Sequence, residues 1–241
     1  MFSYIYNTFF FHPLYNLLVF ASAFMPGNSF GLSIIFVSVV AKLIILPLTH
    51  QSIKVQKKMK EIEPLVSKIK EDFKNDKEAQ AVRTMSLYRE HGINPFSSFF
   101  LVLLQLPLFI ALFYVFKDPI DLASPILYSF TTLPSAIGVN FLGIFELTKA
   151  SLFLAALVGV TQFIQTWLSV PPLPKTEKGK ETSMKHDLAK SMNLQVKYVL
   201  PVLIAFIASK LNSAVALFWI TNNLFGIGHE LFVRWQAKKL V

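Results

Sequence analysis

Five apolar stretches decide what kind of fold this chain can form. A helix needs about 20 apolar residues to cross about 30 Å of hydrocarbon, and four of the stretches have roughly that length. The other, "VKYVLPVLIAFIAS", is shorter and covers only about 21 Å as a helix. Hydrophobic residues make up 54% of the 241 residues, more than a soluble domain of this length could bury. The sequence therefore predicts an all-α polytopic membrane protein with five transmembrane helices, at 30–49, 96–116, 150–170, 196–209 and 213–233.

The basic residues predict how these helices are oriented. Of the 23 Lys and Arg residues, ten lie in 50–95, six in 171–197 and three after residue 233, whereas 1–28 has none. The segments predicted for the opposite side hold only Lys117, Lys149 and Lys210. Because cytoplasmic loops are enriched in Lys and Arg, we expect the N-terminus outside and the C-terminus in the cytoplasm. The net charge of +9 is then mainly a topology signal, with anionic lipid or ribosomal RNA as secondary partners rather than DNA.

The remaining segments complete a single domain over 1–241. Residues 12–26 are expected to form an interfacial helix rather than a cleaved signal sequence, because no Lys or Arg precedes this apolar run. We expect an apolar outer loop at 117–148, a polar cytoplasmic loop at 171–195 and a short cytoplasmic tail at 234–241.

The charged segment at 51–92 has the pattern of a cytoplasmic antiparallel helical hairpin. Its first helix would place five apolar side chains on one seam at 3-4 spacing: Met59, Ile62, Val66, Ile69 and Phe73. The turn "KND" offers Asn75 or Asp76 as the cap of a second helix, which Gly92 ends. The alternative is a solvated charged linker.

Motifs for catalysis are absent from the sequence. There is no cysteine, no phosphate-binding loop, and no metal-ligand spacing among the five scattered histidines. Gly226 and Gly228 lie within an apolar stretch and follow no strand, which favours close helix packing over nucleotide binding. We therefore expect neither an enzyme nor a cofactor-dependent protein.

Polar side chains interrupt four of the five predicted helices in their inner halves. Lys42 is the costliest, because one central lysine opposes insertion by about 2.5–3.5 kcal/mol and each apolar residue favours it by only about 0.3–0.6. Ser38 lies one turn away from it, and the other members are Gln105, Gln162, Gln165, Trp219, Asn222 and Asn223. Since the outer halves are nearly all hydrocarbon, the set predicts a hydrated groove that opens to the cytoplasm and is closed toward the outside.

Each member of this set also has an explanation without a groove. Lys42 could extend its ammonium to the inner headgroups along its own aliphatic stem. A lone Gln or Asn in a membrane helix is more often a hydrogen-bonding link to a neighbouring helix than a site. Trp219 could serve packing alone. Only the shared depth of all these residues favours the groove.

Several longer segments form a specific combination. "SIIFVSVVAKLIILPLT" is followed by the hairpin sequence "IEPLVSKIKEDF" and then by "LYREHGINPFSSFFLVLLQLPLFIALFYVF". "LVGVTQFIQTWL" and "VLPVLIAFIASKLNSAVALFWITNNLFGI" come later. Together they cover about residues 12–238, and the combination resembles the core of the YidC/Oxa/Alb membrane protein insertases, in the bacterial form without a large periplasmic domain.

This resemblance implies an activity, a groove and partners. The family inserts newly made membrane proteins and helps them fold, without a nucleotide. Its groove carries a positive residue five positions before a proline, here Lys42 before Pro47, where most members have arginine. Gln105, Gln165 and Trp219 match further groove positions. The implied partners are nascent membrane proteins and the phospholipid bilayer, with the Sec translocon, the ribosome and a targeting receptor as further candidates, and the implied location is the bacterial cytoplasmic (inner) membrane.

Two other functions are compatible with several membrane helices. A small-solute transporter or channel would place polar groups through both leaflets or break helices in paired halves. An assembly factor without translocation activity would differ from an insertase only in whether nascent chains reach the groove.

Overall fold

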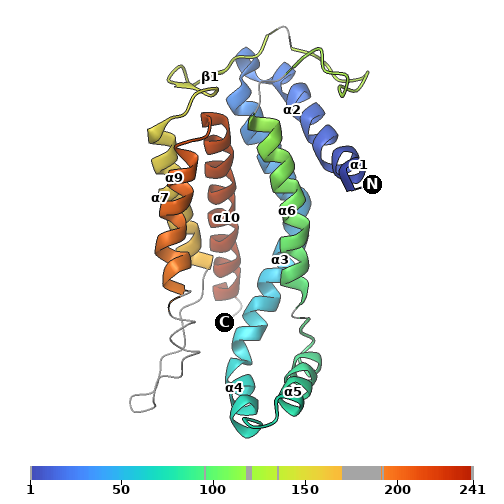
Figure 1. The fold of residues 1–241 in the computed structure, drawn as a ribbon, viewed down its shortest axis with the longest axis vertical. Helices are drawn as coiled ribbons and strands as arrows, with labels where there is room; N and C mark the ends of the chain where they lie inside the picture. The colour runs from blue at the N-terminus through green and yellow to red at the C-terminus, as the bar shows by residue number, and fades with distance from the viewer. Residues whose placement is uncertain are drawn as a thin grey trace. The chain divides into compact units, whose positions relative to one another are not determined.

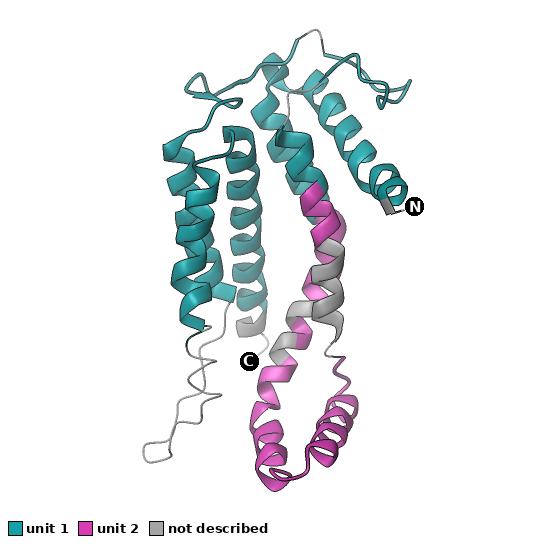
Figure 2. Ribbon diagram, viewed as in Figure 1, with its two compact units in different colours: residues 1–42, 111–241 teal, residues 43–110 magenta. Residues whose placement is uncertain are grey.

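The computed structural model is mainly helical over the residues that it describes, which are 2–94, 96–117, 121–134, 136–169, 191 and 193–239. Within the helices, the side chains of residues 2, 52–53, 56–57, 96–105 and 237–239 are not described. The chain divides into two units, unit 1 with residues 1–42 and 111–241, and unit 2 with residues 43–110 (Figures 1 and 2). Most of the predicted cytoplasmic loop at 171–195 lies outside the described residues.

The N-terminal helix begins earlier than the sequence predicts. Helix α1 (Phe2–Tyr6), the π-helical turn η1 (Asn7–Phe11) and α2 (His12–Phe24) follow one another with helical backbone angles at both junctions. Pro13 has no N–H to donate into a regular α-helical turn, and the wider π turn lies just before it. The helix predicted at 12–26 is thus preceded by two more helical segments.

Polar side chains of α2 hold the outer loop. The Asn16 amide donates to the carbonyls of His12 and Ile126, at 2.9 Å each, and its oxygen accepts from the Tyr128 N–H at 2.7 Å and the Thr131 hydroxyl at 2.9 Å. The Tyr15 hydroxyl exchanges hydrogen bonds with the backbone of Asp121. All the hydrogen-bonding groups of the buried Asn16 side chain are therefore used, as burial of an amide requires.

Two long helices contain proline. Helix α3 (Phe30–Glu61) continues well past the predicted end at residue 49 and includes Pro47, and α6 (Phe96–Lys117) includes Pro107. Ser33 at the start of α3 accepts a hydrogen bond from the buried Ser22 of α2 at 3.1 Å. This bond joins α2 and α3 within unit 1.

Among the described residues, two helices are long and apolar enough to cross a membrane. They are Phe30–Gln51 of α3 and α7 (Leu152–Ser169). In the most apolar 18 residues of each helix, only 39% and 28%, respectively, are buried inside the structure. A core helix of a soluble protein would be mostly buried, so both helices expose apolar side chains that need a nonaqueous environment. That all five predicted helices cross the membrane stays a prediction.

Helices α7, α9 and α10 pack together in unit 1. The π-helical turn η3 (Gln195–Val199) leads into α9 (Leu200–Ala208), and α10 (Ser213–Lys239) extends six residues past the predicted limit of 233. Their shared core consists of small and branched residues: Leu154, Ala155, Val158, Ala208 and Ala216. A Cβ on Gly159 of α7 would lie only 2.9 Å from the Ala205 Cβ of α9, so glycine permits this close approach.

Asn212 joins the ends of two helices. Its amide donates to the carbonyls of Phe116, at 3.2 Å, and Lys117, at 2.7 Å, while its oxygen caps α10 by accepting from the Val215 N–H at 3.1 Å. The Phe116 and Phe218 rings lie 5.3 Å apart beside this link. The last turn of α6 is therefore fixed to the first turns of α10.

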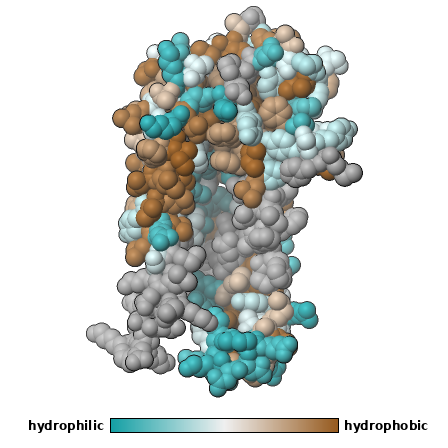
Figure 3. Space-filling view, viewed as in Figure 1, coloured by the Kyte–Doolittle hydropathy of each residue, from teal (hydrophilic) through white to brown (hydrophobic). Residues whose placement is uncertain are grey.

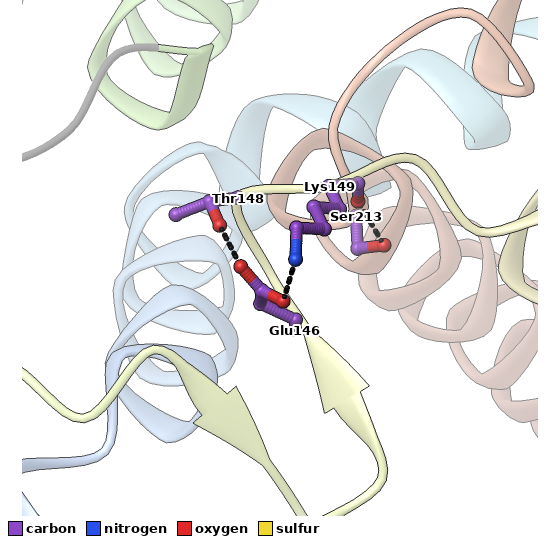
Figure 4. Close-up of polar contacts among 4 residues, drawn as sticks. All are labelled: Glu146, Thr148, Lys149 and Ser213. Carbon is purple, nitrogen blue, oxygen red and sulfur yellow. Dashed lines mark hydrogen bonds and ion pairs between the residues drawn. The ribbon is translucent and has the colours of Figure 1, made fainter.

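A small β-hairpin is the exception to the all-α prediction. Strands β1 (Asn140–Phe141) and β2 (Phe145–Glu146) pair antiparallel within the predicted outer loop. Figure 4 shows the segment after β2, where Glu146 binds Lys149 at 2.6 Å and the Ser213 hydroxyl of α10 donates to the Lys149 carbonyl. Hydrogen bonds from Lys149 and Thr148 lower the pKa of the Glu146 carboxyl, because they stabilise its charged form.

The charged hairpin lies wholly within unit 2, between α3 and α6 in the chain. Helix α4 (Glu63–Asp72) and α5 (Lys77–Glu90) are antiparallel neighbours, and Asp76 caps α5 by accepting from the Ala79 N–H at 2.9 Å, as the sequence predicts. The predicted seam is not on one helix, because the chain turns at Ile62 between α3 and α4, where Pro64 begins the new helix. Ile62 and Val66 nevertheless form a buried cluster, together with Ile93.

The surfaces of the α7–α9 pair and of the α4–α5 hairpin differ in polarity. Hydrophobic residues cover the visible face of α7 and α9, whereas the α4–α5 hairpin is mostly hydrophilic (Figure 3). The exposed apolar side chains of α9 include Val202 at 69% and Phe206 at 62%. This difference agrees with a lipid environment for α7 and α9 and an aqueous one for the hairpin.

The first prediction concerns Asn16. Replacing it with alanine leaves the Tyr128 N–H and the Ile126 carbonyl without their partner, so we expect the free energy of unfolding to fall by about 1–3 kcal/mol. Denaturant titration in mild detergent measures this loss, and limited proteolysis should cut residues 121–134 faster. Asn75→Ala, which removes an exposed asparagine in the turn between α4 and α5, serves as the control. Unchanged proteolysis of the outer loop in the Asn16 variant would contradict the anchoring role.

Candidate functional site

Helix α3 carries the first two predicted groove residues on successive turns. Ser38 is 1% exposed, and its hydroxyl donates to the Ile34 carbonyl of the same helix at 2.6 Å. A serine bonded in this way needs no partner from another helix. Ser38 therefore adds a small side chain, with its polar group satisfied, to the buried face of α3.

Lys42 lies at the edge of that buried face. The preceding Ala41 is 4% exposed and Ile45 is 7% exposed, whereas Leu43 and Ile44 are 52% and 71% exposed. Lys42 itself is half-buried, and its ammonium has no hydrogen bond or ion pair among the side chains that the structure describes. Since an ammonium needs water or an anion to offset desolvation, this position suits contact with a hydrated space.

Helix α7 brings three polar side chains together near its C-terminal end. The Gln162 amide donates to the Thr166 hydroxyl at 3.2 Å and lies 3.5 Å from the Gln165 oxygen. Gln165 also packs against α10, because a Cβ on Gly226 would lie 2.9 Å from its Nε2 atom. Gln162 and Gln165 are both half-buried, so each is positioned by neighbours and still partly accessible.

Helix α10 supplies two asparagines that differ in role. The Asn223 amide, 4% exposed, donates to the Thr161 hydroxyl of α7 at 3.1 Å. The Asn222 amide is half-buried and donates to the Phe218 carbonyl of its own helix at 2.8 Å. Asn223 thus links two helices, whereas the oxygen of the half-buried Asn222 has no hydrogen-bond partner among the described residues.

The structure describes the side chain of Trp219 but only the backbone of Gln105. Trp219 is half-buried and packs against the core shared by α7, α9 and α10. The side chain of Gln105 lies outside the described side chains, so the structure places only its backbone, in α6. The structure therefore joins residues of α7 and α10 through the Asn223–Thr161 hydrogen bond and the packing of Gln165 on Gly226, and the groove as a whole stays a prediction.

Sequence analysis missed the threonines that complete these contacts. Thr161 and Thr166 are 7% and 6% exposed. Their hydroxyls accept hydrogen bonds from the side-chain amides of Asn223 and Gln162, respectively. The i to i+4 spacing of Gln162 and Thr166 was readable in the sequence. The Thr161–Asn223 pair was not, because it depends on how α7 and α10 rotate toward each other.

The two glycines of α10 behave differently. Gly226 allows Gln165 to approach, which confirms close packing at this position. A Cβ on Gly228 would meet nothing within 4 Å, so the same prediction is wrong there. Among the described residues, no group of His, Asp and Glu could hold a metal ion.

The second prediction concerns the Thr161–Asn223 link. Thr161→Val keeps the shape but removes the acceptor of a buried amide, and we expect a loss of about 1–2 kcal/mol in the free energy of unfolding. Denaturant titrations of Thr161→Val, Asn223→Leu and the double variant form a cycle that isolates the pair. Strictly additive losses would show that the hydrogen bond contributes nothing.

Comparison with known proteins identifies the family. A family model described as "60Kd inner membrane protein" matches residues 20–239. A membrane protein insertase YidC of Clostridium tetani is 34% identical over 214 residues, which cover 89% of this chain and 86% of that protein. A membrane protein insertase YidC of Fusobacterium nucleatum is 32% identical over 227 residues, covering 91% of this chain and 96% of that protein. A longer membrane protein insertase YidC of Pelobacter propionicus is 31% identical over 207 residues, which cover 86% of this chain and 35% of that protein. The chain therefore belongs to the 60Kd inner membrane protein family, the YidC/Oxa/Alb family that its sequence resembles.

Proposed function

We propose that this protein is a membrane protein insertase of the bacterial cytoplasmic membrane. The observation that carries the proposal is the family match over residues 20–239, together with relatives that are named insertases and align along nearly their whole length. The exposed apolar faces of α3 and α7 support a lipid environment. Its substrates would be newly made membrane proteins, and insertion would need no covalent chemistry.

The proposed arrangement has five transmembrane helices with the N-terminus outside. The basic residues at 50–95 and 171–197 then face the cytoplasm. The α4–α5 hairpin, with its hydrophilic surface, would receive the nascent chain there. The Sec translocon, the ribosome and a targeting receptor are partners to be tested against this hairpin.

Lys42 would attract the acidic residues of a substrate's outer tail. Two opposite charges about 4 Å apart gain about 4 kcal/mol at an effective dielectric of 20, against about 1 kcal/mol in water. The half-buried position of Lys42, without an ionic partner among the described side chains, would supply that gain to an incoming carboxylate. Lysine makes a point contact where arginine would pair through two hydrogen bonds, so the carboxylate would be held less rigidly.

The half-buried amides would complete the groove. Gln162, Gln165 and Asn222 keep part of their surface accessible, and Gln105 and Ser38 are proposed to lie on the same path. Amide groups would replace part of the substrate's hydration without binding it tightly. The substrate's apolar segment would then partition into lipid, which supplies the net driving force.

The short helix formed by η3 and α9 would assist translocation. This mainly apolar helix, Gln195–Ala208, spans only about 21 Å, against about 30 Å of hydrocarbon. A span of this length is accommodated by local thinning of the bilayer. A thinner bilayer beside α7 and α9 would lower the barrier to moving a polar tail.

The third prediction tests Lys42 by complementation of an insertase-depleted strain. We expect Lys42→Arg to support growth, Lys42→Ala to insert substrates with acidic tails several-fold less well, and Lys42→Glu to fail on them because it repels their carboxylates. Lys54→Glu makes the same charge change at an exposed residue farther along α3 and serves as the matched control. Full activity of Lys42→Glu on acidic-tailed substrates would refute the electrostatic role.

The fourth prediction tests the water in the groove. The chain has no cysteine, so single cysteines at 38, 42, 105 and 165 can be labelled without background. A membrane-impermeant maleimide should reach them from the cytoplasmic side only. Phe36→Cys and Ile164→Cys, at apolar positions 41% and 42% exposed, should stay unlabelled because lipid faces them. Labelling from the outside, or labelling no faster than these controls, contradicts a groove open to the cytoplasm.

A further inference from the structure

The tip of the β-hairpin presents two apolar side chains. The hairpin pairs Asn140 with Glu146 and Phe141 with Phe145, and its tip is Leu142, Gly143 and Ile144. Leu142 is 71% exposed and Ile144 is 75% exposed, among the highest values for large apolar residues in the described chain. Such exposure is unfavourable in water and calls for a covering environment.

The backbone makes the choice of leucine more unusual. Leu142 has φ of 55° and Gly143 has φ of 70°, both in the left-handed region. Glycine and asparagine adopt this conformation most easily, whereas a bulky side chain is disfavoured there. Leucine at position 142 therefore costs free energy twice, through its left-handed backbone and through the exposure of its side chain to water. An apolar environment around the tip would remove the second cost.

The hairpin stands on a fixed base. The Phe141 ring packs so closely on Gly31 of α3 that a Cβ at Gly31 would overlap it. Leu147 is fully buried, donates its N–H to the Val139 carbonyl at 2.9 Å and accepts from the Ala214 N–H of α10 at 3.0 Å. The base therefore contacts the first turns of α3 and α10, and the tip has a defined place relative to the ends of these helices.

The apolar surface continues from the hairpin onto α7. The Phe145 ring stacks on Phe153 in the first turn of α7, with centroids 5.7 Å apart and an angle of 12° between planes. Phe153 is 61% exposed and Leu152 is 79% exposed, and α7 is a candidate membrane span. A surface that runs without interruption from a membrane helix to the hairpin fits lipid better than a folded partner protein.

We propose that Leu142 and Ile144 insert into the outer leaflet at the boundary between headgroups and acyl chains, where the hairpin anchors the outer end of α7. The inference rests on the proposed orientation, which places the start of α7 on the outer side. Apolar side chains that bind at this boundary enter it by about 5–10 Å. The Glu146–Lys149 ion pair at the base would remain in the headgroup and water layer.

The experiment uses single cysteines labelled with the environment-sensitive fluorophore NBD. Leu142→Cys and Ile144→Cys report the tip, and Thr148→Cys reports an exposed polar position beside the base. The full chain is reconstituted into vesicles of phosphatidylcholine and phosphatidylglycerol. We expect the tip probes to emit at shorter wavelength than the Thr148 probe, and shallow spin-labelled lipid to quench them several-fold more strongly.

Two further readings separate the possible failures. Dithionite added outside right-side-out vesicles should reduce the Thr148 probe, which tests the orientation independently of the tip. Leu142→Asn keeps a residue that tolerates positive φ but removes the apolar group, and it should expose the Ile144 probe to aqueous iodide. Tip probes that resemble the Thr148 probe, or that shift only when another protein is added, overturn the lipid contact. A Thr148 probe protected from external dithionite overturns the orientation, and with it the outer-leaflet assignment.

Discussion

Close approach between helices is the condition on which unit 1 depends. In hydrocarbon, apolar faces gain little by meeting each other, so helix association relies on tight packing and on hydrogen bonds between helices. Here Gly159 lets α7 reach α9, Gly226 lets Gln165 reach α10, and the Thr161–Asn223 bond ties α7 to α10. These contacts also fix which polar side chains keep accessible surface, so packing and the proposed groove are set by the same residues.

The sequence predicted the helices well where length and apolar composition decide the structure. The helices at 150–170 and 196–209 correspond to α7 and to η3 with α9, and the cap at Asp76 follows from its position after the "KND" turn. Two departures from the predicted helix limits lie beside prolines, whose effect on helix limits the prediction did not take into account. Pro64 starts a new helix after Ile62, and Pro13 is preceded by a π turn that extends the N-terminal helix. The β-hairpin is too short to give an alternating pattern.

In the candidate site, the unusual residues could be predicted from the sequence, but their hydrogen-bond partners could not. Residue type and depth identified Lys42 and the amides as unusual, because ionisable and amide groups are costly in hydrocarbon. They did not distinguish Asn222, which keeps accessible surface, from Asn223, which bonds to Thr161. That difference depends on the rotation of α10 against α7, and rotation is set by side-chain packing that a single sequence does not display. Membership of the insertase family gives the function, whereas the part of each amide in it stays a proposal.

The link at Asn212 has a mechanical consequence. Any motion that separates the last turn of α6 from the start of α10 must break the hydrogen bonds from the Asn212 amide to the Phe116 and Lys117 carbonyls, whereas the bond to the Val215 N–H stays within α10. Asn212 therefore couples the C-terminal end of α6 to the start of α10, so a displacement of either helix end is transmitted to the other.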